Sequence, residues 1–450
     1  MKKYIFIFIF ILSIFTLSLN NDIIKYEKIG GNAGASCSCG YAYSDNYYLI
    51  GRTDSISGDI KIKFNESGFL FPDSFIMKVN QNAGISSPFI FGGNGTDVLY
   101  DCVKFNNKII CVGYTSSMDG DINPKENAKN IGTYSLLNKK DRKQFFDLKQ
   151  IYKGWLVEYD ILNNKITKSI LFNEFYSIYN VINNSQKNLI IVVRQPVDKE
   201  ENGIKKDINN CYLLELNEKY KIINYYLIPN EVGFVMNLFE ANGKYYLFFY
   251  KDIIVLDKNF KLVTQKKYSA DKGIGVLNSY WDEKNQQFVV IGETESTKVE
   301  GFNIKNNAKE SKYFNIILDK NLNAKSVSYF NINKLVKLNK IVKYKDNYLI
   351  IGNYLKKYFK SAEMEYSEHD IILIMMDKNG KIIKYETYGG YADDIGKDIF
   401  INNNNTITII GECDSETKDD VFNQTKEYIP STEEGDLLFQ DILLITIKAW

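Results

Sequence analysis

Two stretches of nearly the same sequence decide the fold: IIKYEKIGG at residues 23–31 and IIKYETYGG at residues 382–390, which are identical at seven of nine positions. The second stretch follows the apolar run DIILIMM (370–376) and a turn. The last apolar run of the chain, DILLITIK (441–448), is followed by only two residues. The N-terminal copy therefore supplies the strand that the C-terminal unit lacks, and their pairing closes a ring and removes the open ends of a linear array.

A repeated phrase of apolar strand, glycine and polar loop fills the chain between these ends. The glycines are separated by 62, 179, 60 and 59 residues, and they are Gly51, Gly113, Gly292, Gly352 and Gly411. The gap of 179 has room for two more units, and it contains two strand-like runs without the glycine, LIIVVRQP (189–196) and YYLFFYKD (245–252). A second recurring pattern, an apolar strand followed by a turn, comes after each copy of the first pattern. Seven units of four strands predict an all-β fold, a seven-bladed β-propeller of four-stranded antiparallel blades.

The units resemble the repeats of secreted bacterial β-propeller proteins, which read roughly GG, D, GxT, DGD and K-x-D in order. The residues that carry the resemblance are Gly30-Gly31, Gly51, Thr53 and Gly58-Asp59 in unit one, and Gly92-Gly93, Gly113, Thr115 and Asp119-Gly120-Asp121 in unit two. The resemblance covers residues 22–450 and is faint in units three to five. It implies the propeller fold, and it brings no catalytic residues with it.

Residues 1–20 have the features of a secretory signal peptide, with Lys2 and Lys3 before an apolar run from Tyr4 to Leu19. The alternative is an uncleaved membrane anchor, because this run is only slightly shorter than a bilayer span. We therefore expect a single propeller domain over residues 21–450 that is exported and is secreted, periplasmic or associated with the cell surface, without a membrane span in the mature chain. The formal charge of the whole chain is +1, from 56 Lys and Arg against 55 Asp and Glu, which argues against nucleic acid as a partner.

Candidate chemistry is sparse. A single histidine, His369, excludes a zinc centre or a catalytic triad built on several histidines, and we expect it to be an ordinary loop residue. Asp119-Gly120-Asp121 lacks the spacing of a twelve-residue calcium loop, so turn geometry is the preferred interpretation. We expect neither a metal nor a cofactor.

Six cysteines in an exported chain favour disulfides. A two-residue turn at Asn106-Asn107 would place Cys102 opposite Cys111 in a hairpin, as a non-hydrogen-bonded pair whose separation a disulfide accepts. The alternative is two reduced cysteines in a core hairpin.

Long loops between the second and third strands should open on one face of the ring and carry uneven charge. Loop 118–153 has net charge +3, loop 412–441 has net charge −8, and unit four has almost no such loop, which leaves a notch. Because loops on a rigid scaffold often carry recognition, candidate binding residues are Lys139, Lys140, Arg142, Lys143, Asp419, Asp420, Glu433 and Glu434. Solvated spacers without a function are the alternative.

These features favour a noncatalytic recognition or adhesion-type propeller that binds an extracellular protein or glycan through its loop-rich face. One alternative is a carboxylate-based glycan hydrolase or lyase, which would need two carboxylates facing each other across one pocket. The other alternative is a structural cell-surface protein.

Overall fold

A computed structural model of the chain describes most of the predicted propeller. The described residues are 23–30, 34–55, 58–60, 71–80, 84–117, 119–122, 152–201, 204–229, 232–267, 269–270, 274–294, 298–300, 304–305, 313–330, 332–360, 365–390, 393–414 and 441–450. Within these ranges, no helix has the length and apolarity that a membrane crossing requires.

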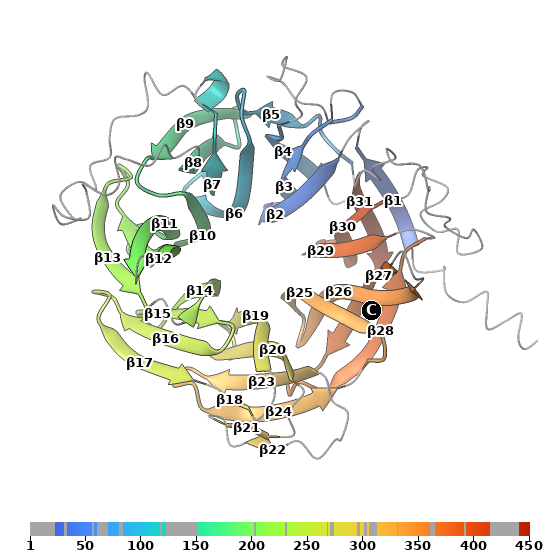
Figure 1. Ribbon diagram of the computed structural model, residues 1–450. Helices are drawn as coiled ribbons and strands as arrows, with labels where there is room; N and C mark the ends of the chain where they lie inside the picture. The colour runs from blue at the N-terminus through green and yellow to red at the C-terminus, as the bar shows by residue number, and fades with distance from the viewer. Residues whose placement is uncertain are drawn as a thin grey trace, which may run out of the picture.

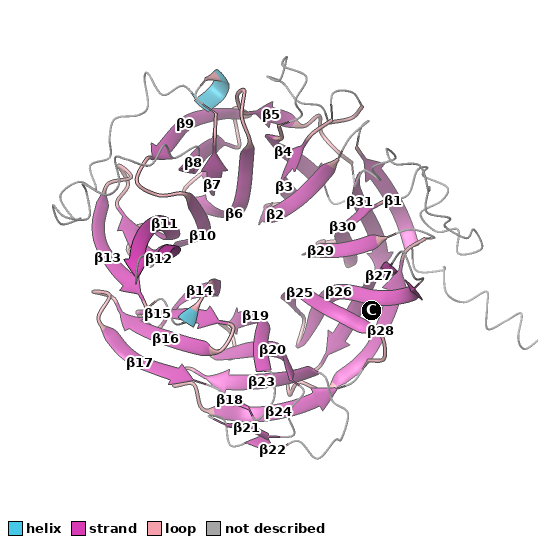
Figure 2. Ribbon diagram, in the orientation of Figure 1, coloured by secondary structure: helices cyan, strands magenta, loops and turns pink. Residues whose placement is uncertain are grey.

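Seven four-stranded antiparallel sheets form a ring, with strands almost throughout and innermost strands toward the axis (Figures 1 and 2). The blades, each from its innermost to its outermost strand, are as follows. Blade 1 is β2 (Ala35–Tyr43), β3 (Asn46–Thr53), β4 (Asp73–Asn80) and β5 (Phe89–Phe91), and blade 2 is β6 (Asp97–Phe105), β7 (Lys108–Thr115), β8 (Lys153–Asp160) and β9 (Lys165–Phe172). Blade 3 is β10 (Ser177–Asn183), β11 (Leu189–Glu201), β12 (Ile204–Leu216) and β13 (Ile222–Ile228), and blade 4 is β14 (Val235–Ala241), β15 (Lys244–Phe249), β16 (Asp252–Asp257) and β17 (Leu262–Lys267). Blade 5 is β19 (Ile274–Asp282), β20 (Gln287–Thr294), β23 (Tyr313–Asp319) and β24 (Ala324–Phe330), and blade 6 is β25 (Leu335–Tyr344), β26 (Asn347–Lys360), β27 (Glu365–Met376) and β28 (Ile382–Tyr388). Blade 7 is β29 (Asp394–Ile401), β30 (Thr406–Cys413), β31 (Asp441–Lys448) and β1 (Ile23–Ile29).

The predicted closure of the ring is confirmed. Strand β1 pairs antiparallel with β31, and the register places Tyr26 opposite Ile445 and Glu27 opposite Leu444. The N-terminal strand therefore completes the blade that the C-terminal residues begin, as Figure 1 shows where β1 and β31 lie together.

Apolar side chains between successive blades hold the ring together. The middle strands are buried almost completely, as in β31, where Ile442, Leu443, Leu444, Ile445 and Ile447 are at most 1% exposed. Both faces of a blade are thus covered by its two neighbours, which explains why these strands read as continuous apolar runs.

The recurring glycine of the second strand makes room for a β-bulge in the first. Each of the seven innermost strands has a register shift at corresponding positions. A Cβ placed on Gly113 would lie 1.9 Å from the carbonyl oxygen of Val98, and one on Gly51 would lie 2.1 Å from that of Ser36. A side chain is therefore excluded at these two glycines, although Val193 and Phe249 occupy the corresponding positions of blades 3 and 4.

The ring has two different faces. We call the face where second strands end the loop face, and the opposite face, with the short hairpin turns, the turn face. On the loop face, the β11–β12 hairpin of blade 3 and the β26–β27 hairpin of blade 6 extend beyond the other strands. Blade 4 has the predicted notch, since only Tyr250 and Lys251 join β15 to β16. The sequence did not predict a small three-stranded sheet of β18 (Ser269–Ala270), β21 (Lys298–Glu300) and β22 (Ile304–Lys305).

Candidate functional site

One position in each blade lies near the loop-face end of the second strand: the residue that follows the bulge-facing glycine or its equivalent. These seven residues are Arg52, Tyr114, Arg194, Tyr250, Glu293, Asn353 and Glu412. The first four, in blades 1 to 4, are basic or aromatic, whereas the last three are acidic or amide residues. The loop face is therefore chemically divided around the axis.

Aromatic rings join across blades 2, 3 and 4 on the first of these halves. Tyr100 of the β6 bulge stacks on Tyr179 of the β10 bulge, with ring centroids 5.2 Å apart and an angle of 16° between planes. Tyr100 also contacts Tyr114 at 5.6 Å, and Tyr179 contacts Phe234 at 6.2 Å. Tyr152 and Tyr176 complete the group, with Tyr152 lying 5.2 Å from Tyr114 and 5.1 Å from Tyr176.

Arg194 lies against the aromatic rings of this half, and Arg52 acts on them through its charge. Arg194 Nη1 donates a hydrogen bond to Tyr179 Oη at 3.3 Å, and its guanidinium lies 5.2 Å from the centroid of the Phe234 ring. Burial raises the pKa of Tyr100 and Tyr114, and the positive charge of Arg52 opposes both increases. We call the set the tyrosine–arginine surface; it comprises Arg52, Tyr100, Tyr114, Tyr152, Tyr176, Tyr179, Arg194, Phe234 and Tyr250.

The tyrosine–arginine surface is accessible at blade 4. Phe234 is 52% exposed and Tyr250 is 42% exposed, next to the two-residue connection that forms the notch. On the other side, the β11–β12 hairpin continues seven residues past Arg194 to Glu201, about 23 Å at the rise of a β-strand. The surface thus lies at the base of a projecting hairpin and opens sideways over blade 4.

Below this surface, the innermost strands carry polar residues directly after their bulges. Lys340 Nζ lies 3.6 Å from Asp398 Oδ2, and the same oxygen accepts a hydrogen bond from Tyr47 Oη at 2.6 Å. The charge of Asp398 raises the pKa of Lys340 and outweighs the effect of burial. Asp398 thus links blades 1, 6 and 7.

Asp101 holds blades 2 and 3 together in a similar way. Its two carboxylate oxygens accept hydrogen bonds from the backbone amides of Cys102 at 2.8 Å and Val181 at 2.9 Å. Burial raises the pKa of Asp101 to about 6. Asp101 and Asp398 therefore satisfy strand edges and neighbouring side chains, and the two carboxylates also interact electrostatically with each other and with Lys340.

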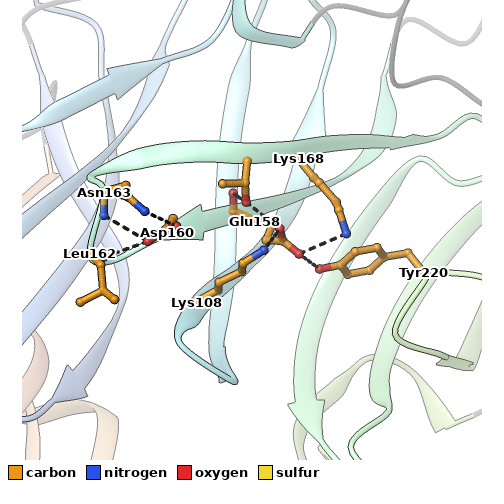
Figure 3. A network of polar contacts seen from close by, with 8 residues as sticks. Lys108, Glu158, Asp160, Leu162, Asn163, Lys168 and Tyr220 are labelled. Carbon is orange, nitrogen blue, oxygen red and sulfur yellow. Dashed lines mark hydrogen bonds and ion pairs between the residues drawn. The ribbon is translucent and has the colours of Figure 1, made fainter.

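A second polar cluster lies at the turn face, between blades 2 and 3 (Figure 3). Glu158, only 3% exposed, accepts hydrogen bonds from Lys108, Thr167 and Tyr220, and Lys168 Nζ lies 3.5 Å from its Oε2. Burial alone would raise the pKa of Glu158, but these hydrogen bonds outweigh burial and lower it. The cluster connects the two blades through a carboxylate that is buried and fully hydrogen-bonded.

The predicted binding residues in the charged loops lie outside the described residues: Lys139, Lys140, Arg142, Lys143, Asp419, Asp420, Glu433 and Glu434. The predicted pairing of Cys102 with Cys111 across the Asn106-Asn107 turn is confirmed. Both residues have free thiols in this structure, so the disulfide stays a prediction. Cys39 adds a third thiol to this pair through a side-chain hydrogen bond with Cys102.

Two expectations about polar residues can be compared with the structure. His369 lies within β27 rather than in a loop, and its Nδ1 is 3.0 Å from Asp393 Oδ1, a contact that raises the pKa of the ring. Asp119 accepts hydrogen bonds from the backbone and side-chain nitrogens of Asn94, and Gly120 has φ of 64°, which is consistent with turn geometry. Among the described residues, no three or more His, Cys, Asp or Glu side chains form a group that could hold a metal ion.

Sequence reasoning missed the tyrosine–arginine surface, although the sequence contains a signal for it. Only three of the 56 basic residues are arginines, namely Arg52, Arg142 and Arg194. Two of these lie on this surface, and they occupy equivalent positions in blades 1 and 3. Nearly all basic residues of the chain are thus lysines, and two of the three arginines lie at the group of aromatic rings.

Fold and site together define an all-β, seven-bladed propeller with an aromatic and basic surface beside its axis. No protein-family model matches the sequence, and no curated protein matches it. Among solved structures, the chain is similar to the polysaccharide lyase Uly1 at 10% identity and a TM-score of 0.47, covering 95% of this chain and 99% of that one.

Two further solved structures are similar at the same low level. One is a protein of unknown function from Dyadobacter fermentans, at 9% identity and a TM-score of 0.41, covering 95% of this chain and 99% of that one. The other is the periplasmic gluconolactonase PpgL of Pseudomonas aeruginosa, at 6% identity and a TM-score of 0.44, covering 76% of this chain and 82% of that one. At these values none of the three structures indicates what this chain binds.

Proposed function

We propose that this protein is an exported, noncatalytic propeller that recognises a glycan through the tyrosine–arginine surface. The observation that carries the proposal is the continuous group of aromatic rings that runs from the partly buried Tyr100 and Tyr179 to the exposed Phe234. Buried apolar contacts would suffice for stability, so rings left open to solvent beside guanidinium groups favour an interaction site.

The chemistry of the rings favours a sugar. Tyrosine combines an apolar ring face with a polar hydroxyl at its edge, and a pyranose combines an apolar C–H face with hydroxyls at its rim. Tyr179 lies on the innermost strand β10 and Phe234 lies just before the innermost strand β14, so successive sugars of one chain could stack on successive blades.

A peptide is a poorer fit to this surface. Peptide recognition by β-proteins commonly uses free backbone groups at a strand edge. Next to the stacked tyrosines, the backbone amides of Cys102 and Val181 are already bonded to Asp101. A broad globular partner is also disfavoured, because the β11–β12 hairpin rises beside the surface.

Binding of defined oligosaccharides to the purified protein tests the proposal. The panel would contain cellohexaose, xylohexaose, and the hexasaccharides of alginate, polygalacturonate and hyaluronan, measured by titration calorimetry. Phe234→Ala and Tyr250→Ala should each weaken binding at least tenfold with little loss of stability, because both side chains are strongly exposed. Tyr385→Ala is the matched control, since this tyrosine is 49% exposed on the outermost strand β28. No binding across the panel, or equal losses in all three variants, would contradict the proposal.

Export also belongs to the proposal, through the segment 1–20 as a cleaved signal. Its test is the N-terminal sequence of the mature protein recovered from outside the cytoplasm, which should begin near residue 21.

A further inference from the structure

We infer that the glycan is acidic, and that carboxylates on its sugars pair with Arg52 and Arg194. This inference rests on the proposed function and specifies the ligand class of the same surface. It begins from the charged residues near the loop-face ends of the second strands, and from which of them have a partner of opposite charge.

The two acidic residues at this position have different partners within the protein. Glu412 pairs with Lys397 at 2.8 Å and also accepts a hydrogen bond from the backbone amide of Cys37 at 3.2 Å. Glu293, the corresponding residue of blade 5, accepts a hydrogen bond from Tyr250 Oη at 3.1 Å. Glu412 is therefore buried and paired with a positive charge, whereas Glu293 is bonded to a neutral hydroxyl.

The basic side is not neutralised in the same way. In the part of the chain that the structure describes, neither Arg52 nor Arg194 forms a salt bridge with a carboxylate, although the charge of Arg52 acts on the nearby Asp54 and opposes the increase of its pKa by burial. Arg194 is instead oriented by neutral groups, the Tyr179 hydroxyl and the Phe234 ring. A guanidinium that is oriented without a counter-charge can give a bidentate pair with a planar carboxylate.

The positions of the two arginines suit a polymer with repeated carboxylates. Arg52 and Arg194 are equivalent residues of blades 1 and 3, and Tyr100 and Tyr114 of blade 2 lie between them. A sugar stacked on the blade 2 tyrosines would therefore have one guanidinium on either side. A single neutral sugar would leave both charges without a partner.

The test compares each acidic hexasaccharide, from alginate, polygalacturonate and hyaluronan, with its own carboxyl methyl ester. The ester keeps the ring and its hydroxyls and removes the negative charge. The wild-type protein should bind at least one acid tenfold or more tightly than its ester, and the difference should shrink as ionic strength rises. Arg52→Gln and Arg194→Gln should each reduce the acid-to-ester ratio at least threefold, whereas Lys219→Gln, an exposed lysine on the turn face, should not change it.

The outcomes separate the two claims. An ester bound as tightly as its acid, with binding lost in Phe234→Ala, would overturn the acidic ligand and leave glycan recognition standing. Binding of neither acids, esters nor neutral hexasaccharides would overturn both claims. Because Arg194 contacts two aromatic side chains, its variant is also checked by thermal unfolding; the exposed Arg52 keeps the test valid if Arg194→Gln fails to fold. An unchanged acid-to-ester ratio in a folded Arg52→Gln protein and in any folded Arg194→Gln protein would overturn the inference.

Discussion

The interface between blades 2 and 3 ends in two different ways at the two faces of the ring. At the turn face, Glu158 is buried and its oxygens are bonded to Lys108, Thr167 and Tyr220. At the loop face, Tyr100 and Tyr179 stack across the same interface with partly buried rings, beside an arginine that has no carboxylate partner among the described residues. The polar groups at the turn face have internal partners and stabilise the fold, whereas we propose that the partly buried groups at the loop face bind a ligand.

The largest expected effect of a single substitution comes from disrupting the Glu158 cluster at the turn face. Glu158→Ala leaves the buried hydroxyl of Tyr220 and the ammonium of Lys108 without their acceptor. The free energy of unfolding should fall by about 3 kcal/mol, measured by urea denaturation. Glu218→Ala, at an exposed position of the nearby β12–β13 turn, is the control and should change it by less than about 0.5 kcal/mol. Equal small effects of both variants would show that the Glu158 cluster does not stabilise the interface.

The second largest effect is on ligand affinity and comes from the stacked tyrosines at the loop face. Tyr179→Ala removes the ring that joins Tyr100 to Phe234, and it should weaken binding of the best hexasaccharide about 30-fold, or about 2 kcal/mol. Tyr220→Phe, in the Glu158 cluster at the turn face, should leave the affinity for this hexasaccharide unchanged. Titration calorimetry of both variants makes the comparison, and a loss of affinity in Tyr220→Phe would erase the distinction between the two ends.

A third prediction uses buried acids whose pKa is shifted in the opposite direction from that of Glu158. Burial raises the pKa of Asp97 to about 7 and that of Asp370 to about 6. An aspartate in the unfolded chain has a pKa of about 4, so the folded protein binds a proton at each of these two carboxylates more tightly than the unfolded chain does. Stability should therefore rise as pH falls from 8 to 5, by about 4 kcal/mol for the two groups together.

Urea denaturation at several pH values measures this rise. Asp97→Asn should make the dependence shallower, because it removes one of the titrating groups. Stability that instead increased from pH 5 to pH 8 would contradict the assignment of these raised pKa values.

The smallest effect comes from two single hydroxyl groups. Tyr220→Phe removes a hydrogen bond to the buried Glu158 and should cost about 1 kcal/mol of stability. Tyr179→Phe removes only a long hydrogen bond from Arg194, at 3.3 Å and partly open to solvent, and should change stability by less than about 0.5 kcal/mol. Thermal unfolding of the two variants compares them, and equal losses would mean that the loop-face end is also a structural connection.

Much of the fold could be predicted from the sequence, because the copies at 23–31 and 382–390 reveal the missing strand directly. The recurring glycines marked the second strands for a physical reason, as the bulge opposite Gly113 leaves no room for a Cβ. The short connection in blade 4 was also readable, since no polar loop separates its two apolar runs.

The candidate site could not be predicted in the same way. Tyrosine occurs 33 times, so its positions carry little information until the bulges bring Tyr100 and Tyr179 together across two blades. The sequence analysis placed recognition in charged loops, which stand out in composition. The scarcity of arginine was the readable signal, and it needed the alignment of Arg52 with Arg194 to become meaningful.

We propose that the ligand binds at the tyrosine–arginine surface of the loop face and not at the Glu158 cluster of the turn face. The most direct test of this proposal is a crystal structure with the tightest-binding acidic hexasaccharide. We expect sugar rings stacked on Tyr179 and Phe234, with a carboxylate of the ligand in contact with Arg194 or Arg52. A sugar bound instead at the turn face, or along the outermost strands of the blades, would contradict the proposal.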